Sequence, residues 1–138
     1  MKRSQLSIVF TGEAQRISAE LNVPLILNNV SSNAGSDGSS IRLDILNAPD
    51  QSLSIQGGAK RRTGIAQFTA TGQKGEGEQG ILSLCDSIAD YFPDNRVLST
   101  SFGIIDIYQP TQVSPVIVSD SGASAAVSVY FSVIFSEE

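Results

Sequence analysis

The chain has 138 residues, of which nine are basic and fourteen acidic, and it carries a net charge of −5. This length suits a single domain, 1–138, with one hydrophobic core, and 41% hydrophobic residues are enough to fill that core. An acidic chain lacks the concentrated basic surface that binding to a phosphate backbone requires. The absence of histidine and the single cysteine exclude serine triads, cysteine–histidine dyads and most zinc sites.

The sequence gives no sign of export or of membrane insertion. Its one cysteine, Cys85, cannot form an internal disulfide, so nothing indicates an oxidising compartment. No apolar run is long enough to span a bilayer, and Met1-Lys2-Arg3 is not followed by the apolar segment of a signal peptide. We therefore expect a soluble protein, made in the cytoplasm, without a membrane partner.

The first predicted element is an amphipathic helix that ends before Pro24. Its apolar residues recur at steps of three and four: Leu6, Phe10, Ala14, Ile17 and Leu21. Residues 31–40 (SSNAGSDGSS) have no apolar periodicity and predict a flexible loop. The alternation over residues 41–46 then predicts a half-buried strand.

The middle of the chain predicts a second loop, a strand and a second helix. Residues 57–63 are glycine-rich and basic, which indicates a loop that is either flexible or ordered by a partner. Residues 64–71 have the composition of a strand, with Phe68 as its bulkiest residue. After the glycine-rich residues 72–80, a helix extends to Pro93. The apolar face of this helix comprises Ile81, Leu84, Cys85, Ile88 and Phe92.

The last third predicts β-structure. Residues 102–108 and 113–118 are strand candidates, and Pro115 places the second one at a sheet edge. The final strand has the clearest alternation of the chain, with Val127, Val129, Phe131, Val133 and Phe135 on one side. The order of elements predicts an α+β fold, a mainly antiparallel sheet with two helices packed on one face.

A glycine-rich segment, Gly75–Gly80 (GEGEQG), lies between the predicted strand 64–71 and the second helix. It matches G-x-G-x-x-G, the turn on which dinucleotide-binding folds hold a pyrophosphate. However, Glu76 and Glu78 would place carboxylates at the pyrophosphate position. The strands also alternate, whereas those of a parallel sheet form continuous apolar runs. We interpret the segment as a turn that leads into a helix, with nucleotide binding as the less favoured alternative.

Lys60, Arg61 and Arg62 form the basic cluster of the chain, and Lys74 could lie near them across a hairpin. These four residues are the candidate contacts with a partner, either DNA or an acidic neighbouring subunit. The alternative is a solvated loop that keeps the protein soluble. Three adjacent charges are too few to support strong nucleic-acid binding by themselves.

No catalytic, cofactor-binding or metal-binding residue is expected. Asp86 and Asp90 stand one helical turn apart, but a hard cation would need further oxygen ligands that the sequence does not indicate. A pair of solvated carboxylates explains them better. Cys85 belongs to the apolar face of its helix, which favours a small core residue over a nucleophile.

Several segments together follow one pattern of elements. From Lys60 to Phe92 the chain has a basic segment, a strand that starts at Gly64, a glycine-rich turn and a helix of the form ILSLCDSIADYF. The helix that ends before Pro24, the Asn28-Asn29-Val30 segment and the closing SAAVSVYFSVIFSEE fit the same pattern. In this arrangement the chain resembles the tail terminator proteins of long-tailed bacteriophages.

The resemblance implies a structural virion protein and not an enzyme. Family members form a hexameric ring at the head-proximal end of the tail tube, stop its polymerisation and provide the surface to which the head joins. The implied partners are other copies of the chain, the tail tube protein and the head–tail connector or neck proteins. DNA would pass through the ring without sequence-specific binding. Another neck or tail protein, such as a head-closure protein or a tube subunit, remains an alternative.

Overall fold

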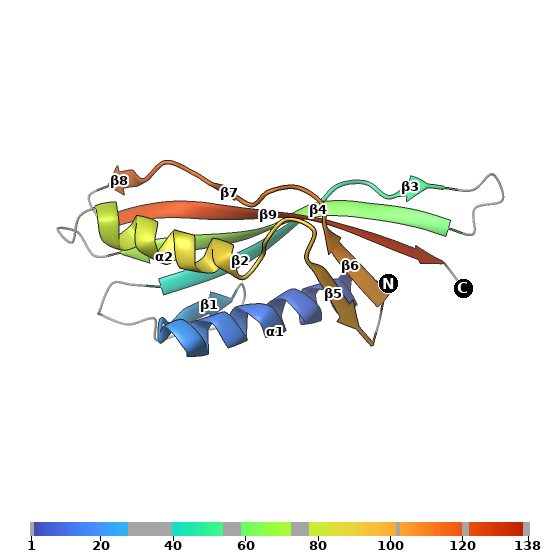
Figure 1. Ribbon diagram of the computed structural model, residues 1–138, viewed down its shortest axis with the longest axis horizontal. Helices are drawn as coiled ribbons and strands as arrows, with labels where there is room; N and C mark the ends of the chain where they lie inside the picture. Colours follow the sequence, from blue (N-terminus) through green and yellow to red (C-terminus); the bar gives the residue numbers. More distant parts are fainter. Residues whose placement is uncertain are drawn as a thin grey trace.

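The computed structural model describes residues 2–27, 40–53, 59–72, 78–101, 103–119 and 122–136. In these segments two helices and nine strands follow one another, and all nine strands belong to one sheet (Figure 1). The elements are α1 (Arg3–Leu21), β1 (Leu25–Leu27), β2 (Ser40–Asn47), β3 (Gln51–Ser52), β4 (Ala59–Gly72), α2 (Glu78–Asp90), β5 (Val97–Thr100), β6 (Gly103–Ile107), β7 (Gln112–Val113), β8 (Ile117–Ser119) and β9 (Gly122–Ser136).

Two long antiparallel strands, β4 and β9, form the centre of the sheet. They pair over the whole length of β4, from Ala59 opposite Ser136 to Gly72 opposite Ala123. On the far side of β4 lie β2 and β3, while β8, β7 and β6 successively pair with the far side of β9. The order β1-β2-β4-β9-β6-β5 is antiparallel except for the parallel pair β1–β2. The predicted mainly antiparallel sheet is confirmed.

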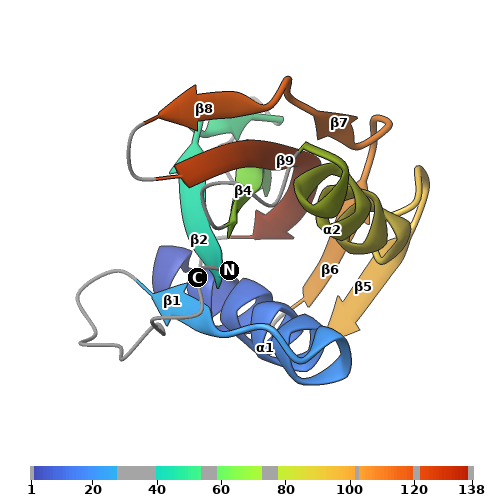
Figure 2. The same cartoon turned by 90° about the vertical axis from the view of Figure 1, so that its left-hand side faces the viewer.

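Both helices pack on the same face of the sheet. Alternate residues of β4 and β9 point to this face, and there the ring of Phe131 lies 5.0 Å from that of Phe10 in α1. On the same face, the ring of Phe68 lies 5.3 Å from that of Phe92, just beyond α2. Seen end-on in Figure 2, the sheet curls, and α1 lies across its open side. The predicted α+β fold, with two helices on one face, is therefore confirmed.

The helices use the residues that their periodicity predicts. In α1 the buried residues are Leu6, Phe10, Ala14 and Ile17. In α2 and its continuation they are Ile81, Cys85, Ile88 and Phe92, with Leu84 partly buried. Asn22 ends α1 in a left-handed conformation with φ 56°, and Pro24 prevents the helix from continuing.

Two predictions about the strands need correction, and one strand was missed. Residues 59–63 are not a loop, because β4 begins at Ala59 and pairs there with β3 and β9. The predicted strand 113–118 is two short edge strands, β7 and β8, on either side of Pro115, whose missing N–H interrupts pairing. The strand β5 was not predicted. The predicted loop 31–40 lies outside the described residues except for Ser40, which belongs to β2.

Candidate assembly surface

The outer face of the sheet, opposite the helices, is the candidate functional surface. Between the buried positions of β4 and β9, the alternate residues point outward, and most of them are half-buried by their neighbours. No described helix packs on this side. A sheet face of this kind is available to another protein.

One end of this face is apolar, and we call it the outer patch. The strand register places Ile65 between Leu46 and Tyr130, and the Tyr108 N–H donates to the Tyr130 carbonyl. These four residues, with Asn47, Ala48, Thr63 and Gly64, line a shallow hollow of about 350 Å³.

A second hollow, of about 370 Å³, adjoins the first and shares Thr63 and Tyr108 with it. Ile134 lines this second hollow, together with Arg61 and Asp106 on either side. The outer patch comprises Leu46, Ile65, Ile104, Tyr108, Tyr130 and Ile134.

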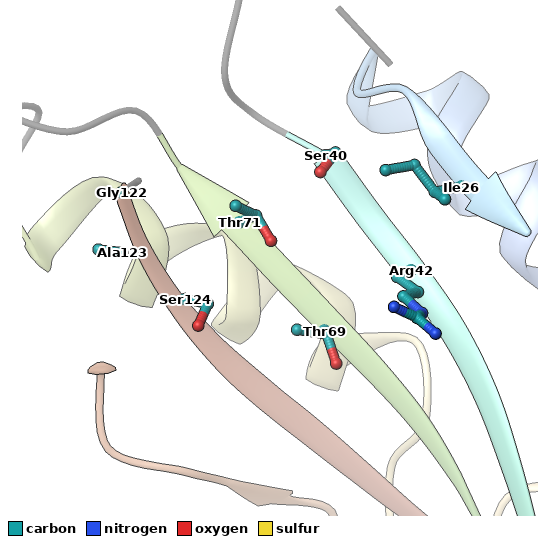
Figure 3. Close-up of a pocket in the computed structure, with 8 residues that line it drawn as sticks. All are labelled: Ile26, Ser40, Arg42, Thr69, Thr71, Gly122, Ala123 and Ser124. Carbon is teal, nitrogen blue, oxygen red and sulfur yellow. The ribbon is translucent and has the colours of Figure 1, made fainter. Parts of the chain in front are cut away.

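The other end of the outer face is polar (Figure 3). There a hollow of about 390 Å³ is lined by the hydroxyl-bearing residues Ser40, Thr69, Thr71 and Ser124 and by Arg42. The Arg42 guanidinium lies 3.3 Å from the Asp44 carboxylate, and the side chain is about half exposed. The hydroxyls can donate and accept hydrogen bonds, and the guanidinium can donate them. Side chains of this kind suit polar contact with another molecule.

The basic cluster is divided by the alternation of β4. Arg61 is exposed and lines the outer face, Lys60 is half-buried, and Arg62 points to the inner face with its side chain only 4% exposed. The predicted partner contacts of Lys60 and Arg61 therefore stay a prediction, while Arg62 is engaged within the protein. Lys74 lies outside the described residues.

Arg62 is held by a two-point ion pair with Asp50. Its Nε donates to Oδ1 at 2.8 Å and its Nη2 to Oδ2 at 3.0 Å, and the guanidinium lies 4.7 Å from the centre of the Phe135 ring. Hydrogen bonding from Arg62 lowers the pKa of the Asp50 carboxyl, with a smaller contribution from Arg3. This pairing explains how a basic run can continue a strand: the charge that points inward is neutralised.

The remaining chemical candidates do not form a site among the described residues. Cys85 is buried, and its burial raises the pKa of the thiol to about 11, so the thiol stays protonated and unreactive. Asp86 and Asp90 are exposed on α2, and the described residues include no group of three side chains that could hold a metal ion.

In the Gly75–Gly80 segment, residues 75–77 lie outside the described residues and residues 78–80 are the first residues of α2. The strand before the segment, β4, is informative. It pairs with β2, β3 and β9, and all three pairs are antiparallel. A dinucleotide crevice forms at the ends of neighbouring parallel strands joined by a helix. The described pairs of β4 therefore do not provide the parallel strands that dinucleotide binding requires, which counts against the nucleotide-binding alternative.

Comparison with known protein families shows the family to which the chain belongs. A family model described as phage tail terminator protein matches residues 9–131, which is most of the chain. The chain belongs to this family. It is accordingly a structural phage tail protein, part of the virion, that associates with tail and head components, and its family is structural and not enzymatic.

A solved structure shares the fold of the whole chain. One solved structure superposes with a TM-score of 0.81 at 17% sequence identity, covering 100% of this chain and 99% of the other. At this identity the likeness shows a shared fold. No curated protein sequence matches the chain. Among the described residues, no helix is long and apolar enough to cross a membrane.

Sequence reasoning missed the outer patch. Its members Ile104 and Ile134 are each next to a core residue of the same strand. In the sequence they therefore appear as part of a continuous apolar run, and this run does not itself indicate that they face the other side of the sheet. Only the strand register, which brings Leu46 and the two tyrosines together across three strands, reveals the surface. The available signals were Tyr130 and Ile134, which interrupt the run of serines on the outer side of the last strand.

Proposed function

We propose that the protein forms a hexameric ring on the head-proximal end of the tail tube, stops tube polymerisation there and offers the surface to which the filled head joins. The family match over residues 9–131 carries this proposal. A terminator acts by occupying the binding surface of the growing end without presenting an equivalent surface for the next ring of tube subunits. In this role no bond needs to be made or broken.

The partners follow from this position. The ring would contact further copies of itself, the tail tube protein on one side and the head–tail connector or neck proteins on the other. DNA would pass through the ring when it leaves the filled head. The net charge of −5 per chain supports a channel to which a polyanion does not adhere.

An amber codon in the gene of the parent phage tests the proposal. We expect electron micrographs of the lysate to show overlong tail tubes beside filled, unattached heads. Supplying the protein from a plasmid should restore normal tail length and joining, which is the control for polar effects on neighbouring genes. Tails of normal length that fail to join heads would indicate a connector or head-closure protein instead. Normal infectious particles would contradict an assembly role.

A further inference from the structure

The strand β8 has apolar residues on both of its faces, and both faces are open. Ile117 stands opposite Ser124 and Val118 opposite Ala123, so the two side chains point to opposite sides of the sheet. Each is 66% exposed. Among the described strands, β8 pairs only with β9, which leaves its other edge open as well. An edge strand of this kind is normally protected by charge or by a covering element.

The outer patch is the second uncovered apolar surface, and it is hollowed. Leu46, Tyr108 and Ile134 line its two adjoining hollows and are between 43% and 53% exposed. Ile104 lines neither hollow, but it is 55% exposed and stands two residues before Asp106 on β6, so its side chain lies on the same face. Of the ten large apolar side chains exposed in the described part of the chain, six belong to β8 or to this patch. Exposed apolar surface that is gathered in this way marks a protein contact more often than scattered residues do.

The two surfaces lie at opposite ends of the molecule. In Figure 1, β8 is at one end of the long β4–β9 pair, and β3 marks the other. Ile117 pairs with Ser124, and Ile134 lies ten residues further along β9, about 33 Å away at roughly 3.3 Å per residue. The chain therefore cannot cover its own patch with its own β8.

We propose that β8 of one copy docks into the outer patch of the next copy, so that subunits associate head to tail. A protruding apolar strand and an apolar hollow at opposite ends of one chain are the two unlike surfaces that a heterologous contact requires. Repetition of such a contact gives a ring when the rotation between subunits closes. This assignment rests on the proposed ring-forming function and names the surfaces that the ring uses.

Charge also favours a second copy as the occupant. The described residues of β8, Ile117–Ser119, are uncharged. Beside the patch, Arg61 and Asp106 have opposite charges, so its margin has no net charge that would repel a neutral strand or select a charged one. The uncharged residues of β8 can therefore dock there without bringing like charges together.

Two matched double variants test the assignment by sedimentation equilibrium. I117E/V118E removes the docking strand, and I104E/I134E removes the patch. All four side chains are more than half exposed, so the variants should keep the wild-type thermal unfolding. We expect multimers for wild type and monomers for each variant alone. An equal mixture should give dimers and nothing larger, because each variant retains the surface that the other has lost.

A control variant and a cross-link complete the test. I8E/L82E adds the same charges at exposed positions on α1 and α2, and it should assemble as wild type does. In a Cys85→Ala background, mild oxidation of a mixture of the Ile117→Cys and Ile104→Cys variants should give a mixed disulfide dimer. Oxidation of a mixture of Ile117→Cys and Ile8→Cys should not.

Several results would overturn the proposal: a monomeric wild type at millimolar concentration, a multimer that survives both double variants, a control that also dissociates, or a mixture that stays monomeric and does not cross-link. Dimers of I104E/I134E alone would indicate instead that β8 pairs with β8. None of these results bears on tail length in the amber lysate, so the capping function is judged separately.

Discussion

The buried guanidinium of Arg62 is stabilised by the carboxylate of Asp50. Asp50→Asn keeps the shape of the side chain but takes the carboxylate away from a guanidinium whose side chain is 4% exposed. Removing one partner of a buried pair costs about 3–5 kcal/mol, and because Asp50 is 23% exposed we expect about 2–4 kcal/mol here. Urea unfolding measures the loss. Asp44→Asn, which breaks the exposed Arg42–Asp44 pair, should cost less than about 1 kcal/mol.

The same pair gives the stability a pH dependence. Because the folded protein lowers the pKa of Asp50, the pair contributes its full stability above the ordinary carboxyl pKa. That contribution disappears as the pH falls through the lowered, folded-state pKa. We expect the difference in unfolding free energy between wild type and Asp50→Asn to be constant near neutral pH and to shrink below about pH 4. An equal difference at pH 7 and pH 3 would contradict this.

At the scale of elements, substitution by alanine should have opposite effects on stability at Gly64 in β4 and at Gly12 in α1. A Cβ at Gly64 in β4 would lie 2.5 Å from the Leu46 carbonyl oxygen and 2.7 Å from Cζ of Phe131, so Gly64→Ala forces the strands or the ring to move. Overpacking of this kind costs about 1–3 kcal/mol. Gly12 is exposed in α1 with nothing within 4 Å, and Gly12→Ala should stabilise the protein by about 0.5–1 kcal/mol. Thermal unfolding of the two variants should shift in opposite directions; a stabilising Gly64→Ala would contradict the packing.

The sequence predicts best the elements in which buried residues recur at one regular spacing along the chain. The apolar spacing of α1 and the alternation at the end of β9 depend on local chemistry, and both predictions hold. The start of β4 could not be predicted, because Arg62 occupies an inward position that only the distant Asp50 makes acceptable. The outer patch depends on residues from four strands, β2, β4, β6 and β9, whose pairing is set by the whole sheet. A local sequence pattern does not contain the register between strands that are far apart in the chain.

At the scale of the whole molecule, charge and assembly are linked. Duplex DNA carries about one negative charge per 1.7 Å, and binding it requires basic side chains that release its counterions. In the proposed ring, chains of net charge −5 would add their negative charges, so the field of the ring would repel DNA in its channel. The exposed Arg61 is the described residue of the basic cluster that could reverse this locally.

We therefore expect the assembled protein to leave the fluorescence anisotropy of a labelled duplex unchanged at about 150 mM salt, where non-specific binding depends on phosphate contacts. Arg61→Gln should leave this result unaltered. Salt-dependent binding by the wild type would contradict a non-adhesive channel. In that case Arg61→Gln would decide the role of the basic cluster: a phosphate contact at this residue would reduce the slope of log affinity against log salt by about 0.9. An unchanged slope would place the DNA contact elsewhere and leave Arg61 as a residue that faces a neighbouring protein.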